Sequence, residues 1–236
     1  WFFNAIGGTG GDGGIKITFT CSTIPITATE GFNLSTNLPS CWNKQTVTGA
    51  DYLSVVGTDV DPFTTPVTTT PFEGADMVKY NSFTAPAGNS QRLVTPPLSS
   101  LGITGGVDVE FYWSSNNTYK VGSPNPTDRI QIQYSTDAIT WVSAGSTVPR
   151  FLPYDNQNWI KQTVNIPTAV NNVSKFYIGF LFISDNSLSM YMDKVTIKPT
   201  PKVILVTPSS HKLCTSYYTI LTASSTAGYS YTWSPS

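Results

Sequence analysis

The sequence predicts an all-β protein built as an antiparallel β-sandwich. In two runs, residues 107–113 and 129–135, apolar and polar side chains alternate with a period of two. Such alternation is typical of strands that pack one face against a second layer. No window shows a sustained helical period. The apolar positions of the two runs are Val107, Val109, Phe111 and Trp113, followed by Ile130, Ile132 and Tyr134.

Ten strands are expected in the main domain, with turn-forming residues between them. The loop Thr58–Pro71 is rich in Thr and Pro, lacks periodicity and should be long and exposed. We expect at most one helical turn, near Pro167–Asn171. The ten expected strands are Ile24–Thr29, Asp51–Val56, Met77–Ser82, Arg92–Thr95, Val107–Trp113, Arg129–Ser135, Thr140–Ala144, Lys161–Ile166, Phe176–Phe182 and Tyr191–Lys198.

The composition indicates an extracellular surface protein. Only 11% of the residues are charged, against about 25% in average soluble domains, and Thr, Ser and Asn provide the polar surface instead. The net charge is −1 and no Lys/Arg run occurs, so nothing attracts nucleic acid. The longest apolar run, Phe176–Ile183, is too short to cross a bilayer.

The chain divides into three parts. Residues 1–21 contain the glycine-rich run Gly7–Gly14 and are expected to end a preceding glycine-rich domain; a phosphate-binding loop would need a strand before it and a helix after it. Residues 22–199 form the main domain. After the junction Pro199–Pro201, residues 200–236 should begin a second, incomplete sandwich, because three strand patterns are too few for a core. We therefore expect an internal piece of a longer protein.

Three cysteines leave at least one without a partner in the chain. Cys21 and Cys41 are close enough in sequence to form a disulfide, and free buried cysteines are the alternative. Cys214 belongs to the C-terminal part and is expected not to bond to either of them.

The main domain offers no catalytic set. The single histidine, His211, lies outside it, which excludes a Ser–His–Asp or Cys–His arrangement there. The chain has 14 acidic residues, enough for the paired acids of glycoside hydrolysis, but no spacing singles out a pair. We therefore do not expect an enzyme.

Two acids interrupt apolar positions. Glu30 shares a parity with Ile24, Ile26 and Ala28, and Asp193 shares one with Val195 and Ile197, although a buried carboxylate is costly without a partner. The first and last strands of antiparallel sandwiches often lie side by side, which would bring the two acids together. A hard cation with oxygen ligands, Ca²⁺ above all, would relieve their repulsion. The alternative is that both acids lie at frayed strand ends in water.

Several strings resemble the MAM-like jelly-roll modules of the choice-of-anchor J and cleaved-adhesin type, which occur in secreted bacterial proteins. The resemblance covers about Ile24 to Lys198, and the strings appear in the family's order. They are Thr29-Glu-Gly-Phe-Asn33, Leu38-Pro-Ser-Cys-Trp42, Glu73–Ser82 with Arg92–Pro96, Tyr134–Trp141 with Ala138 where Gly is usual, Ile178-Gly-Phe180 and Met192-Asp-Lys-Val195.

The resemblance implies a jelly-roll fold with a structural Ca²⁺ near the first and last strands. Glu30 and Asp193 would be ligands and Asn33 a third, whereas Lys194 replaces an acid that the family commonly has. The tail from Cys214 to Pro235 is similar to the Ig-like repeats of giant adhesins. Such adhesins, in gliding bacteria, are exported by type IX secretion.

The sequence thus predicts a non-catalytic binding or spacer segment of a cell-surface adhesin that serves adhesion or gliding motility. Its ligand would be a polysaccharide or another surface, met by loops such as Thr58–Pro71 and Asn116–Thr127, with Tyr119 and Tyr154 stacking on sugars. Outer-membrane motility and secretion machinery would bind other parts of the full-length protein. The alternatives are a carbohydrate-binding accessory module of a secreted hydrolase and a purely structural spacer.

Overall fold

The structure is a computed structural model that describes residues 21–33, 37–60, 68–115, 127–150, 159–166 and 168–201. Within these ranges the only helix is a single 3-10 turn, η1 (Thr168–Val170), at the place where one helical turn was expected. None of the described residues forms a helix long and apolar enough to cross a membrane. The predicted all-β class is confirmed.

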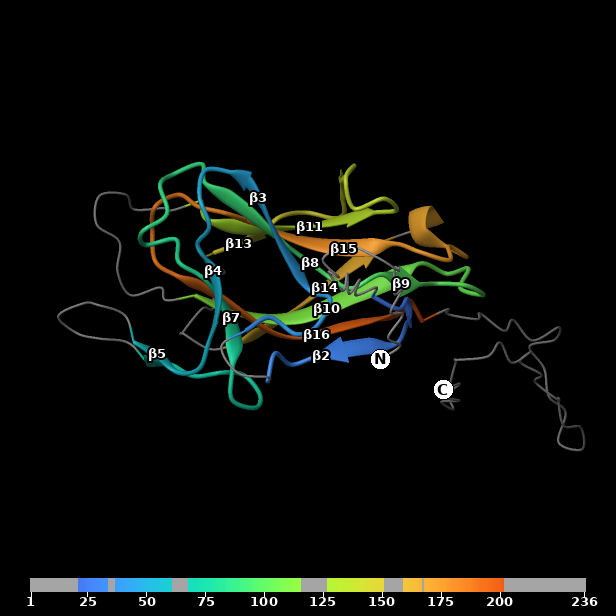
Figure 1. The fold of residues 1–236 in the computed structure, drawn as a ribbon, viewed down its shortest axis with the longest axis horizontal. Helices are drawn as coiled ribbons and strands as arrows, with labels where there is room; N and C mark the ends of the chain where they lie inside the picture. The colour runs from blue at the N-terminus through green and yellow to red at the C-terminus, as the bar shows by residue number, and fades with distance from the viewer. Residues whose placement is uncertain are drawn as a thin grey trace, which may run out of the picture.

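Two antiparallel sheets of six strands lie face to face (Figure 1). Two short pairs, β1 (Ile24–Pro25) with β9 (Leu98–Ser99) and β5 (Asp59–Val60) with β6 (Thr68–Thr69), lie outside them. The first sheet runs β14 (Ile160–Ile166), β10 (Val107–Ser115), β16 (Met190–Pro199), β7 (Met77–Tyr80) and β4 (Leu53–Val56), with β2 (Ala28–Glu30) also on β16. The second runs β12 (Val142–Ser143), β11 (Arg129–Ser135), β15 (Tyr177–Ile183), β8 (Ser90–Val94) and β3 (Asn43–Thr48), with β13 (Val148–Pro149) also on β11.

The core lies between the sheets and follows the predicted alternation. The apolar side chains of β10, β11 and β15 that face the other sheet are almost fully buried. Glu110 and Tyr112, on the other face of β10, are partly exposed. Phe111 of one sheet meets Phe180 of the other edge to face, with ring centroids 5.5 Å apart. Hydrophobic burial between the two layers therefore holds the sandwich together.

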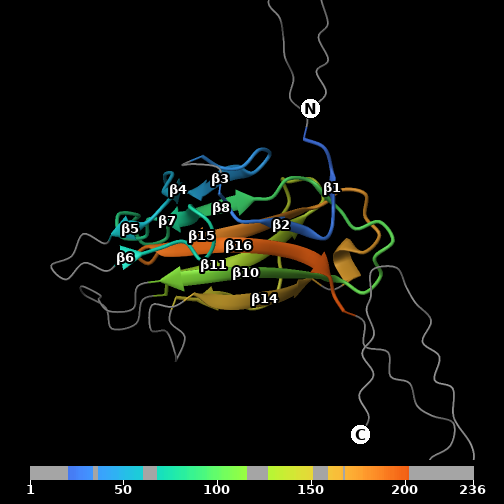
Figure 2. The same cartoon turned by 90° about the horizontal axis from the view of Figure 1, so that it is seen from below.

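The first and last strands of the sandwich are neighbours, as predicted. β2 pairs antiparallel with β16, with Ala28 opposite Ile197 and Glu30 opposite Val195. The two strands lie side by side in both views of the fold (Figures 1 and 2). The chain therefore enters and leaves this domain on adjacent strands.

One strand prediction was wrong, and several strands were not predicted, among them the short β5 and β6 within the predicted loop Thr58–Pro71. Ile24–Thr29 is not one strand: β1 pairs with β9, and after Ile26 and Thr27 the chain continues as β2 on β16. Asn43–Thr48 is a strand that the sequence did not predict, because this edge strand has no apolar alternation and much of it is exposed. The other predicted strands are present. Arg129–Ser135 has the predicted bounds, the others have shifted ends, and only Val142–Ser143 is left of Thr140–Ala144.

A β-bulge interrupts β16 at Lys194. Glu110 lies opposite Thr196 and Tyr112 lies opposite Asp193. The same stretch of the pairing therefore advances three residues along β16 and two residues along β10. Lys194 takes a left-handed backbone conformation, with φ of 46°, as the first residue of such a bulge often does. The extra residue reverses the alternation. Asp193 therefore shares the outer face of the sheet with Tyr112 and not the inner face with Val195, and the parity prediction for Asp193 was wrong.

Candidate functional site

Asp193 is fully buried although it lies on the outer face of its sheet. The segment before β7 covers it: the Phe72 ring stacks on Tyr112 with centroids 3.7 Å apart. The Asp193 carboxylate accepts hydrogen bonds from the backbone N–H of Glu73, at 3.1 Å, and of Lys194, at 2.7 Å. Burial raises the pKa of Asp193 to about 6, although the bonds from backbone amides act in the opposite direction.

Glu73 is the acid beside Asp193 that the sequence analysis did not single out. Its Oε2 lies 2.8 Å from the ammonium of Lys194, and the Lys194 Nζ also lies 5.6 Å from the centroid of the Phe72 ring. The hydrogen bond with Glu73 raises the pKa of Lys194. Lys194 thus places a positive charge beside the Glu73 carboxylate. The sequence feature that could have pointed to Glu73 is the string Glu73-Gly-Ala-Asp, where the acids do not alternate with apolar residues as they would in a strand.

Asn33 lies against the same segment, and Glu30 bonds to the backbone just before Asn33. The Asn33 Oδ1 accepts from the backbone N–H of Ala75 at 3.0 Å, so Asn33 and Asp193 hold neighbouring residues of one loop. The Glu30 Oε1 accepts from the backbone N–H of Phe32 at 2.8 Å. A Cβ on Gly74 would lie 1.8 Å from the Asn33 Oδ1, and Gly74 has a φ of 65°, so glycine is required there.

The donors around the 73–75 segment are of the chemical type that Ca²⁺ prefers, namely carboxylate and amide oxygens. Asn33, Glu73 and Asp193 would hold the ion. The predicted ligand Glu30 lies opposite Val195 and so faces the inner side of the sheet, whereas Asp193 faces the outer side. In the described part of the chain, however, no three His, Cys, Asp or Glu side chains converge on one point, and Lys194 already offsets one negative charge. A cation here would depend on the Asn33 amide and on backbone carbonyls as well as on the acids.

Glu30 also forms part of the wall of a small pocket of about 100 Å³ near the start of the sandwich. Trp42 and Thr95 contribute to the same wall, and Val195 and Ile197 of β16 contribute apolar surface. Trp42 packs edge to face against Phe32, with ring centroids 5.1 Å apart. The pocket is mostly apolar, with a single carboxylate.

Cys21 and Cys41 form a disulfide with their Cα atoms 5.8 Å apart. It closes a loop that contains β1 and β2. The other predicted residues, Tyr119, Tyr154, His211 and Cys214, lie outside the described residues, as do most of the two loops proposed to meet a ligand. The expected flanking domains, residues 1–21 and 200–236, lie almost wholly outside them too.

The second sheet presents a different group of side chains on its outer face. Arg92 is on β8, and its guanidinium lies over the Trp141 ring, 4.4 Å from the centroid. Its Nε donates to the Gln133 Oε1 and its Nη1 to the Gln45 Oε1, both at 2.8 Å. Arg92 is only 8% exposed, and this burial lowers its pKa. The guanidinium nevertheless remains positively charged, because an arginine is not deprotonated in proteins.

Gly179 on β15 makes room for this group. A Cβ at Gly179 would lie 2.6 Å from the Arg92 Cδ and 2.7 Å from the Trp141 Cζ3. Arg92 and Trp141 therefore lie directly against the backbone of the sheet. The Gln45 Nε2 donates to the carbonyl of Ala138 at 3.1 Å, so its amide is fixed from both ends. We call Arg92, Trp141, Gln45 and Gln133 the Arg92 cluster.

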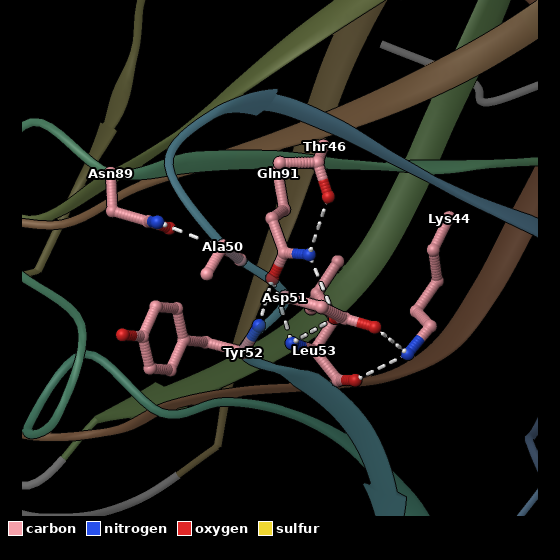
Figure 3. Close-up of polar contacts among 8 residues, drawn as sticks. All are labelled: Lys44, Thr46, Ala50, Asp51, Tyr52, Leu53, Asn89 and Gln91. Carbon is pink, nitrogen blue, oxygen red and sulfur yellow. Dashed lines mark hydrogen bonds and ion pairs between the residues drawn. The ribbon is translucent and has the colours of Figure 1, made fainter.

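The inner side of β8 carries a second polar group (Figure 3). The Gln91 Oε1 accepts from the backbone N–H of both Tyr52 and Leu53. The Gln91 Nε2 donates to the Asp51 Oδ1 at 2.7 Å and lies 3.4 Å from the Thr46 Oγ1. Every polar atom of this buried amide has a partner, and the group ties β8 to the start of β4. Its role is structural.

No family model matches the sequence, and no curated protein sequence matches it either.

Several solved structures are similar to this chain. The K1 cleaved adhesin domain of Lys-gingipain from Porphyromonas gingivalis W83 is 16% identical with a TM-score of 0.48, over 74% of this chain and 98% of that one. The K3 cleaved adhesin domain of the same protein is 19% identical with a TM-score of 0.48, over 72% and 96%. The CBM22-1 xylan-binding domain of Paenibacillus barcinonensis Xyn10C is 13% identical with a TM-score of 0.42, over 75% and 96%. Similarity at this level transfers neither ligand nor activity.

Proposed function

We propose that residues 22–199 form a non-catalytic module of a secreted, cell-surface adhesin and that this module binds polysaccharide. The observation that carries the proposal is the Arg92 cluster. Hydrogen-bonding amides, a guanidinium and an indole lie together on the outer face of a sheet whose strands hold them in place. Polar groups beside aromatic surface on rigid elements are typical of small-ligand and glycan sites.

The adhesin part of the proposal rests on the family resemblance of the sequence. Export by type IX secretion, a place on the bacterial surface and a role in adhesion or gliding motility belong to the same proposal. The alternative is an accessory module that brings a secreted hydrolase to its substrate. A full-length sequence with tandem surface repeats would favour the adhesin, whereas a catalytic domain on the same chain would favour the accessory module.

Glycan binding is tested by applying the 236-residue chain to an array of plant, bacterial and algal polysaccharides. We expect specific binding to at least one class, reduced when Trp141 is replaced by Ala. As a control, Phe83→Ala changes an exposed aromatic side chain that does not belong to the Arg92 cluster. If no polysaccharide binds, the module is a spacer and the proposal is wrong.

We also propose that Ca²⁺ binds as a structural ion at Asn33, Glu73 and Asp193. An ion that binds only the folded state stabilises it by about 2.7 kcal/mol at a hundredfold excess over its Kd. EDTA should therefore lower the melting temperature, and the double variant Glu73→Gln, Asp193→Asn should remove that sensitivity. Identical melting curves with and without chelator would exclude the ion.

A further inference from the structure

The Arg92 guanidinium has no acidic partner in the described part of the chain. Its two hydrogen-bond acceptors are the neutral amides of Gln45 and Gln133. The described ion pairs all use lysines, at positions 44, 79, 161, 194 and 198. Transferring a cation from water into a protein is costly unless an anion compensates for it. Arg92 is 92% removed from solvent without that compensation.

The nearest acid along the hairpin is occupied elsewhere. Asp137 follows β11, and its Oδ1 accepts from the Ser135 Oγ and from the backbone N–H of Ile139 and Thr140. These bonds hold the pKa of Asp137 far below its usual value. Burial, and no neighbouring charge, accounts for the lowered pKa of Arg92. The positive charge of Arg92 is therefore not matched within the described protein.

The guanidinium is fixed by two of its three nitrogens, and the third, Nη2, remains available. Nε and Nη1 each donate one hydrogen bond, and neither a hydrogen bond nor an ion pair in the described residues uses Nη2. Trp141 covers one face of the guanidinium plane, and the glycine backbone at Gly179 lies beneath both side chains. An arginine held in this way is preorganised, because little side-chain entropy remains to be lost when a ligand binds.

We propose that Arg92 binds the carboxylate of a uronic acid unit, so that the ligand is an acidic polysaccharide; this inference rests on the proposed function. A carboxylate oxygen can accept a charge-assisted hydrogen bond from the free Nη2. On the same face, Leu181 and Tyr177 alternate with Gly179 along β15 and are half-buried, which leaves apolar surface beside the charge for a sugar ring.

The low density of positive charge on this chain favours a uronate ligand over a densely sulfated glycan. Sulfated chains are recognised by clusters of Lys and Arg, and this chain has 13 such residues, no basic run and a net charge of −1. A single fixed arginine surrounded by neutral amides suits one carboxylate in each binding site. We therefore expect polygalacturonate or alginate to bind more tightly than dextran sulfate.

The test measures binding of the 236-residue chain to polygalacturonate and alginate by isothermal titration calorimetry. Each polymer is paired with its carboxyl-reduced, neutral form, and dextran sulfate is a separate arm. Arg92→Met should weaken binding of the uronates at least about tenfold, as expected when a charge-assisted hydrogen bond is lost. Arg129→Met removes an equal charge from the other end of the same face and should leave the affinity unchanged. Melting curves of both variants verify that they are folded.

The outcomes separate this inference from the proposed function. If Arg92→Met binds the uronates more weakly than the wild type does, and the wild type binds the reduced polymers more weakly than the acidic ones, both the uronate inference and the proposed function are supported. Equal binding of the acidic and reduced polymers, or an unchanged affinity of folded Arg92→Met, overturns the uronate inference and leaves glycan binding intact. Preferential binding of dextran sulfate overturns the choice of carboxylate. Failure to bind any polysaccharide overturns the proposed function as well.

Discussion

Gln91 and Arg92 are neighbours on β8, yet they meet opposite conditions. Gln91 points into the sandwich, where its neutral amide is bonded at both ends by Tyr52, Leu53 and Asp51. Arg92 points to the outer face, where a full charge is nearly buried with only neutral partners. The inner group serves the fold, whereas the outer group is the one that we propose binds a ligand.

The largest effect is expected from Gln91→Ala. The change removes the acceptor of the Tyr52 N–H and the hydrogen bond that Gln91 donates to the Asp51 carboxylate, whereas the Leu53 N–H keeps the Asp51 Oδ1 as a second acceptor. An unsatisfied buried donor costs about 1–3 kcal/mol and a lost hydrogen bond to a charged group about 1.5–3 kcal/mol, so we expect a loss of about 4 kcal/mol in the free energy of unfolding. Urea denaturation measures it. Thr46→Val, which removes only a 3.4 Å contact, serves as the control, and an equal loss in both variants would contradict the structural role of Gln91.

Asp193 extends the comparison to a buried charge on the other sheet. Its pKa is raised from 3.8 to about 6 on folding, so the folded state binds the proton more tightly than the unfolded state. The contribution of Asp193 to stability therefore falls as the pH rises through this range, by about 3 kcal/mol in total. Urea denaturation in EDTA at pH 4, 5, 6 and 7 should show this slope, and Asp193→Asn should flatten it. If the variant shows the same dependence of stability on pH as the wild type, another titrating group causes that dependence.

Gly179→Ala tests how closely the Arg92 cluster lies against the sheet. The added Cβ would come within 2.7 Å of both Arg92 and Trp141, so both side chains must move away. We expect a loss of about 2 kcal/mol, as for other overpacked sites, together with weaker glycan binding. If the variant is as stable as the wild type and binds equally well, the cluster does not need this close approach.

Arg92→Met should have the smallest effect on stability, less than about 1 kcal/mol. Replacing a poorly compensated buried charge by an apolar side chain of similar length is often neutral or stabilising. Thermal denaturation measures the change, and the same preparation serves the binding test. A loss as large as that of Gln91→Ala would show that Arg92 belongs to the structural core, and the contrast between the two faces of β8 would disappear.

The sequence predicted the layers of the fold because alternation survives wherever a strand has one buried face. Arg129–Ser135 was predicted with the bounds that the structure shows. Asn43–Thr48 was not predicted, because an exposed edge strand does not need apolar residues. The bulge at Lys194 was not predicted either, since a left-handed conformation favours glycine and a lysine gives no such signal.

The candidate sites were harder to predict than the strands. Arg92 and Trp141 are 49 positions apart, and only the pairing of β8, β15 and β11 brings them together. A buried arginine with neutral partners has no local sequence signature. Glu30 and Asp193 were predicted because acids interrupt apolar runs, and Asn33 was added from the family resemblance, but the prediction placed Asp193 on the wrong face. One inserted residue in a strand is enough to cause that error.

The disulfide determines which strands transmit a pulling force through this domain. Tension that reaches Cys21 passes through the sulfur atoms to Cys41 and does not travel along the loop that contains β1 and β2. The load then enters the second sheet at β3 and leaves from the first sheet along β16. Resistance to stretching therefore depends on the whole interface between the sheets. The β2–β16 pairing, which would otherwise unzip one hydrogen bond at a time, is relieved of the load.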